Sequence, residues 1–150
     1  MPQSPVFAPE EAVRRLNAVL AHAWMVRTFL KHADEIQESE EMLDVPRTLY
    51  DGIRATEPAF QRRDWAEFLR RLKGKLPKLR RAADSFAANF RRFSPHTNFE
   101  MASASLLGVV ERIEEILAAV DWDAVRALPR PDGPAGAAAD PLDEIEIPEV

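Results

Sequence analysis

The sequence predicts an all-α protein: a four-helix bundle with long antiparallel helices, a short extra C-terminal helix and a disordered acidic tail. Two observations support this fold class. Apolar residues recur at intervals of three and four along most of the chain, as one face of a helix requires, and period-two alternation occurs only at 145–147. Hydrophobic residues make up 46% of the 150 residues and charged ones 30%, as in a globular protein with one core. We assign 1–128 to a helical bundle domain and 129–150 to the tail.

We expect the first helix over about 9–38. Pro9 suits its first turn, because the amide that proline lacks would have had no partner there, and Glu10 and Glu11 suit the positive end of the helix dipole. Over 18–30 this helix is apolar nearly all round, so both of its faces must be covered. A central place in the bundle, or contact with a second copy, would cover them.

The second helix is expected to be short, over about 40–56, with Pro58 closing it because proline disfavours helical backbone at the residue before it. Three long helices and one short one would leave part of the first helix uncovered. We therefore expect a homodimer.

The third helix, over about 64–93, has the clearest pattern, and Asp64 with Glu67 is expected to cap it. Its apolar residues alternate steps of four and three, as in a coiled coil, which requires a neighbouring helix at a shallow angle. They are Trp65, Leu69, Leu72, Leu76, Leu79, Ala83, Phe86, Phe90 and Phe93. Because the pattern keeps its phase across Pro77, we expect the helix to continue there with a kink.

A matching apolar stripe predicts a fourth helix over about 97–120, and Asp121 is expected to cap a short last helix that ends near Leu128. From 129 onward the chain is rich in Pro, Gly, Ala and acidic residues, which cannot bury enough apolar surface to fold alone. This composition predicts the disordered tail.

Composition excludes several classes of function. With no cysteine, the chain cannot form disulfides, Cys-ligated zinc sites, iron–sulfur clusters or thiol nucleophiles. The glycines form no phosphate-binding loop, and no catalytic motif of familiar hydrolases, kinases or dehydrogenases is present. No apolar run approaches the roughly 20 residues of a membrane span, and the start of the chain does not resemble a secretion signal. We expect no cofactor, no membrane span and a cytoplasmic location.

Charge is divided unevenly along the chain. Residues 1–130 carry 20 basic and 19 acidic side chains, a net of +1, whereas 131–150 carry six acidic and no basic ones, a net of −6. Leu142, Ile145, Ile147 and Val150 punctuate this acidic segment. The tail is therefore a plain disordered terminus, a docking peptide for a protein partner, or a segment that folds back onto the basic third helix.

The third helix carries eleven basic side chains against three acidic ones over 62–92, a net of +8, and nearly all of them point away from its apolar seam. The candidate binding residues are Arg70, Arg71, Lys78, Arg80 and Arg81. This face is a solvated surface balanced by the acidic residues of 34–44, a nucleic-acid site, or a contact for an anionic membrane or an acidic partner.

Arg27 falls on an apolar face of the first helix, where a guanidinium needs partners because desolvating an unpaired charge is costly. We expect an ion pair, with Glu100 or Asp51 as candidates, or a side chain that reaches the bundle edge. Arg27 and His32 also form an Arg-x4-His pattern that resembles the signature of the HEPN family of helical ribonucleases. The resemblance implies a paired-subunit site in which Arg27 and His32 act on RNA.

The histidines do not predict a metal site. His22 is expected to be a core or interface residue, and it lies about 15 Å along the helix from His32, too far for one shared ion. His96 and Glu100 could face one ion, but the paired Glu-x-x-His motifs of di-iron bundles are absent. We expect no metal.

These observations together predict a non-enzymatic interaction or scaffold protein, homodimeric, with a docking tail and an unidentified protein partner. Two alternatives remain open: a HEPN-like ribonuclease that uses Arg27 and His32, and a nucleic-acid-binding module that uses the basic face of 62–92. Whether the chain is an enzyme is not decided by its sequence.

Overall fold

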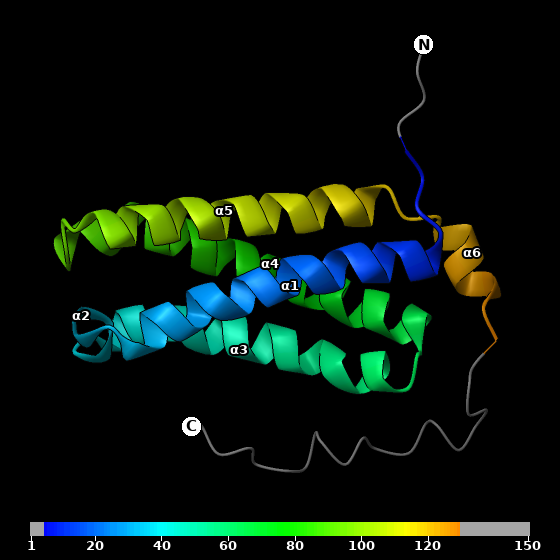
Figure 1. The fold of residues 1–150 in the computed structure, drawn as a ribbon, viewed down its shortest axis with the longest axis horizontal. Helices are drawn as coiled ribbons and strands as arrows, with labels where there is room; N and C mark the ends of the chain where they lie inside the picture. The colour runs from blue at the N-terminus through cyan, green and yellow to red at the C-terminus, as the bar shows by residue number, and fades with distance from the viewer. Residues whose placement is uncertain (1–4, 130–150) are drawn as a thin grey trace.

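The computed structural model describes residues 5–129, which form a bundle of four long helices (Figure 1). The long helices are α1 (Pro9–His32), α3 (Glu40–Gln61), α4 (Trp65–Asn89) and α5 (Thr97–Ala118). The short elements are α2 (Asp34–Gln37), the 3-10 turn η1 (Phe90–Arg92) and α6 (Trp122–Ala127). The predicted all-α class is confirmed, and the predicted tail lies outside the described residues from 130 onward.

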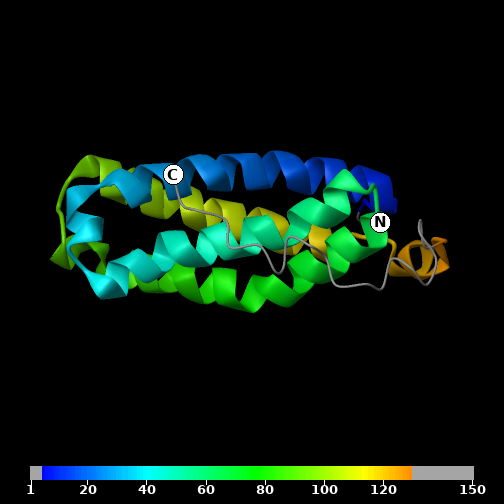
Figure 2. The ribbon, with the colours of Figure 1, turned by 90° about the horizontal axis from the view of Figure 1, so that it is seen from below.

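Consecutive long helices run in opposite directions and enclose a single core (Figures 1 and 2). Helix α1 packs against α3 and α5, and α4 packs against the same two helices from the opposite side. The first long helix therefore meets the last one, and the four form a closed ring around the core. No helix among residues 5–129 is long and apolar enough to cross a membrane.

The heptad pattern of the third predicted helix is the buried seam of α4. Leu72, Leu79 and Phe86 are all buried, and the ring of Phe86 stacks on that of Phe90 with 5.5 Å between centroids. The helix continues through Pro77, as its unbroken pattern predicted. Burial of this seam explains why a helix containing a proline and a glycine remains intact: its stability comes from packing more than from backbone propensity.

The predicted end of the first helix is wrong. Helix α1 stops at His32, six residues early, because Ala33 adopts an extended backbone (φ −78°, ψ 127°). The turn allows Ile36 of α2 to enter the core, and the Gln37 side chain donates a hydrogen bond of 3.0 Å to the carbonyl of Lys31. Apolar burial and a replacement hydrogen bond therefore compensate for the helix break.

The prediction of a short second helix is also wrong, since α3 is 22 residues long and contains Pro58. Pro58 is buried, and two residues later Phe60 packs its ring against Trp65 and Phe68, with centroids 6.0 and 6.1 Å apart. These contacts offset the missing proline amide. Four long helices now surround the core, so the uncovered gap from which we first expected a homodimer does not exist.

The remaining boundaries agree closely with prediction. Helix α4 gives way to the 3-10 turn at Phe90, and α5 ends at Ala118 instead of 120. Both predicted caps are confirmed: Asp64 accepts a hydrogen bond of 3.1 Å from the amide of Glu67, and Asp121 accepts one of 3.0 Å from that of Ala124.

The segment before α1 is attached to the junction of α5 and α6. The amide of Phe7 donates to the carbonyl of Ala119 at 2.7 Å, and the amide of Asp121 donates to the carbonyl of Phe7 at 2.9 Å. The guanidinium of Arg15 lies 4.5 Å from the Phe7 ring centroid. Both ends of the described chain therefore lie at one end of the bundle (Figure 1).

Candidate functional site

Three of the five predicted binding residues on α4 are engaged in ion pairs. Arg70 and Arg71 both pair with Glu67 on the same helix, at 3.8 and 2.8 Å. Arg80 bridges to Glu114 of α5 and also approaches Asp84 at 3.4 Å. The hydrogen bond that Arg80 donates to Glu114 raises the pKa of its guanidinium above the ordinary arginine value. The protein's own carboxylates thus neutralise part of the predicted cationic ridge.

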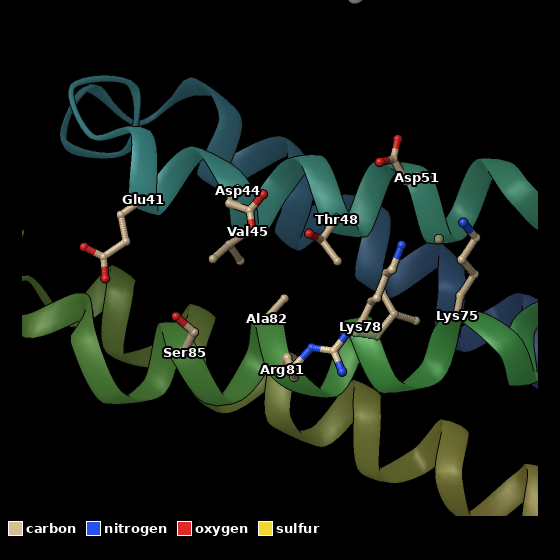
Figure 3. A pocket seen from close by; sticks show the side chains of 12 residues that line it. Glu41, Asp44, Val45, Thr48, Asp51, Lys75, Lys78, Arg81, Ala82 and Ser85 are labelled. Carbon is tan, nitrogen blue, oxygen red and sulfur yellow. The ribbon is translucent and has the colours of Figure 1, made fainter.

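The other two predicted residues, Lys78 and Arg81, line a groove between α3 and α4 with a volume of about 510 Å³. Lys75 joins them on the α4 side, and its side chain and that of Lys78 extend toward α3 (Figure 3). Within residues 5–129 these three cations take part in none of the ion pairs that occupy the rest of α4. Of the five candidate binding residues, Lys78 and Arg81 are thus the two that make no ion pair within residues 5–129.

The opposite wall of this groove is acidic. It is formed by Glu41, Asp44 and Asp51 of α3 (Figure 3). Glu41 and Asp44 belong to the acidic segment 34–44 that is predicted to balance the basic face, whereas Asp51 is predicted as a partner of Arg27. Glu41 also reaches across to Arg92, at 3.1 Å. Three acids against three bases give the lining no net charge, so a uniformly anionic nucleic-acid backbone would be attracted by one wall and repelled by the other.

Close contact between α3 and α4 fixes the floor of this groove. A Cβ atom on Gly52 would lie 3.0 Å from Cδ2 of Leu79, closer than ordinary packing permits. Glycine therefore allows the two helices to approach, and buried Val45 and Leu79 complete an apolar floor. The groove was not predicted from the sequence, although Gly52 inside an amphipathic helix is a signal of close approach.

Arg27 is buried, with 6% of its surface exposed, and its guanidinium lies against two aromatic rings. The guanidinium carbon is 4.5 Å from the Trp24 centroid and 4.9 Å from that of Tyr50. The electron-rich ring faces stabilise the cation there. His32 is exposed on the last turn of α1, so the described part of one chain does not bring Arg27 and His32 into a common cleft.

His22 is exposed, so of the two expected places, core or interface, the core is wrong and the interface stays a prediction. Its Nε2 atom lies 3.3 Å from the hydroxyl of Ser105 on α5. His96 caps α5 by accepting a hydrogen bond of 3.0 Å from the amide of Asn98. No cluster of three or more potential metal-binding side chains occurs in the described part of the chain.

The surface where α1 and α5 lie side by side is free of charged side chains over much of its length. We call it the α1–α5 face and define it by exposed or half-exposed residues that carry no charge or, in His22, an imidazole. They are Ala18, His22, Met25, Phe29, Met101, Ala104, Ser105 and Gly108. Met25 and Met101 are 64% and 56% exposed, and Phe29, whose ring lies 5.5 Å from that of Phe99, is 37% exposed.

A second groove, of about 590 Å³, opens between α1 and α3 and is predominantly apolar. Its lining includes Leu20 and Trp24 of α1, Ile53 and Phe60 of α3, and Phe68 of α4. No pattern in the sequence indicated this groove, because it depends on which sides of three helices meet.

Comparison with known proteins finds no matching protein family, no similar curated protein and no similar solved structure.

Proposed function

We propose that the protein is a non-enzymatic helical interaction module that associates with a second copy of itself through the α1–α5 face. The main support is the exposure of Met25, Phe29 and Met101, together with the absence of any exposed lysine, arginine, aspartate or glutamate within 18–29 of α1 and 101–108 of α5. Contiguous exposed apolar residues without charge are typical of protein contact surfaces.

The arrangement of large and small residues favours a second copy over an unrelated partner. Helices α1 and α5 are antiparallel, and His22 faces Ser105 near the middle of the face. The large side chains of Met25, Phe29 and Met101 lie at one end of the face. The other end carries the small residues Ala18 and Gly108, so its surface projects less. A two-fold axis through the middle would set the projecting end of each copy over the low end of its partner, as a self-complementary interface requires.

The presence of Gly108 inside α5 also supports a contact at this face, because glycine lowers the stability of a helix. A glycine inside a helix costs about 1 kcal/mol relative to alanine. Nothing lies within 4 Å of the position that a Cβ would occupy there, so packing inside the monomer does not explain this glycine. The open space leaves room for a neighbouring molecule to approach the backbone of α5 closely.

Analytical ultracentrifugation tests this proposal. The wild-type chain should sediment as a dimer of twice 16.9 kDa at micromolar concentration, and 1 M NaCl should not dissociate it, because apolar contacts are not screened. Met101→Glu should shift the equilibrium to monomer, since it places like charges in the interface. Ala88→Glu, at an exposed position of α4 outside the face, is the matched control and should remain dimeric. A monomeric wild-type chain at about 100 µM would refute the proposal.

A further inference from the structure

The groove between α1 and α3 leaves large apolar side chains partly exposed. Trp24, Ile53 and Phe60 line it and are only half-buried. Its volume of about 590 Å³ lies within the range of about 300–1,000 Å³ that is usual for binding pockets. Arg54 and Glu57 on its wall pair with each other at 2.6 Å. The groove therefore selects its occupant by apolar contact and not by charge.

The last residues of the same chain have the apolar side chains that such a groove requires. Residues 142–150, which lie outside the described part of the chain, contain four large apolar residues, whereas 130–141 contain none larger than alanine apart from proline. They are Leu142, Ile145, Ile147 and Val150. Successive side chains of an extended peptide point to opposite sides, so Ile145 and Ile147 would share one edge and Glu146 would lie on the other. The apolar edge would enter the groove while the carboxylates stay in water.

The chain is long enough to bring this segment to the groove. Helix α6 ends at Ala127 and packs against α1 and α4 at the end of the bundle where α1 begins (Figure 1). The groove residues of α1 lie between Asn17 and Met25, about 12–24 Å along the helix axis from Pro9. A bundle two helices wide measures about 20–24 Å across. The twelve residues 130–141 span up to about 40 Å, which covers both distances together.

Attachment to the same chain favours this segment over a free ligand. A short tether holds its segment at an effective concentration on the order of millimolar, which a free apolar ligand in solution would have to exceed. We propose that residues 142–150 dock in the groove between α1 and α3 of their own chain, with Ile145 and Ile147 against Trp24 and Phe60. The groove shares only Met25 with the α1–α5 face, so this docking does not depend on self-association.

Paramagnetic broadening in NMR spectra of the full chain tests the docking. The chain has no cysteine, so Glu149→Cys provides a single site for a nitroxide label. The label should reduce the backbone amide signals of 17–25 and 53–61, which include the groove residues of α1 and α3. It should reduce much less the signals of 101–108 in α5 and of 75–85, which include the α4 wall of the charged groove.

Variants of the segment itself show which of its edges makes the contact. Ile145→Ser combined with Ile147→Ser should restore the signals of 17–25. Glu144→Ser combined with Glu146→Ser is the matched control, with the same number of changes on the acidic edge, and should leave those signals reduced. An equimolar mixture of ¹⁵N-labelled chains without nitroxide and unlabelled chains that carry it should show no such reduction, because each segment docks on its own chain.

A variant of the groove completes the test. Ala21→Glu places a carboxylate at the exposed edge of the groove and should restore the signals of 17–25. Ala88→Glu, at an exposed position of α4 outside the groove, is its control and should not restore them. Equal reduction in all four ranges, reduction confined to 75–85, or reduction in the mixed sample would each overturn the docking.

Discussion

Replacing Gly52 by alanine measures how closely α3 and α4 approach each other. Any Gly→Ala change inside a helix gains about 1 kcal/mol from backbone propensity. At Gly52 the new Cβ would lie 3.0 Å from Cδ2 of Leu79 and 3.5 Å from its Cδ1 and Cγ atoms. Leu79 is 2% exposed, so its side chain has to shift by a few tenths of an ångström within its packing, and overpacking should cost about 1–3 kcal/mol. We expect a net loss of between about 0 and 2 kcal/mol in the free energy of unfolding.

Gly74→Ala is the matched control, because Gly74 is also a glycine inside a helix but nothing lies within 4 Å of its Cβ position. It should gain about 0.5–1 kcal/mol. Urea unfolding followed by circular dichroism at 222 nm gives the free energy of unfolding of both variants. The slope of this free energy against urea concentration checks that both variants expose the same amount of surface when they unfold. If Gly52→Ala were stabilised as much as Gly74→Ala, α3 and α4 would not be in contact at Leu79, and the floor of the charged groove would be wrongly described.

Three further predictions use the same unfolding assay. Phe86→Ala should lose about 3–5 kcal/mol, because it removes a fully buried ring that stacks on Phe90, and a loss below about 1 kcal/mol would contradict its core position. Asp64→Ala should lose about 1 kcal/mol through the helix cap, whereas Asp64→Asn, which keeps an acceptor, should retain most of the stability. A double-mutant cycle on Arg80 and Glu114 should give a coupling of about 0.5 kcal/mol that decreases in 1 M NaCl, because their side chains are 30% and 41% exposed; a coupling above about 2 kcal/mol would show that solvent does not screen this pair.

The parts of the fold that depend on periodic local signals could be predicted from the sequence. The seam through Leu72, Leu79 and Phe86 and the caps at Asp64 and Asp121 each depend on residues a few positions apart. The end of the second helix was predicted wrongly for the opposite reason. Pro58 is a local stop signal, but it is overridden by the packing of Phe60 against α4, which no local rule contains.

The binding surfaces depend on which helices become neighbours, so less of them could be predicted. The basic residues of α4 were identified, yet the sequence could not show that Glu67 and Glu114 would neutralise several of them. Nor could it show that the acids of α3 would stand opposite Lys75 and Lys78. Arg27 was correctly placed in an apolar environment, but its aromatic partners include Tyr50, which comes from another helix.

The hydrogen bonds between Phe7 and the turn after α5 hold the start of the described chain beside the end of the last long helix. The peptide enters beside the point where the last long helix ends, and α1 closes the ring of helices by touching α5. The order of the helices along the chain can therefore be changed without changing which helices are neighbours. A rearranged polypeptide in which a linker joins the two ends and the backbone is opened at 94–96, between η1 and α5, would retain every interhelical neighbour of the natural chain.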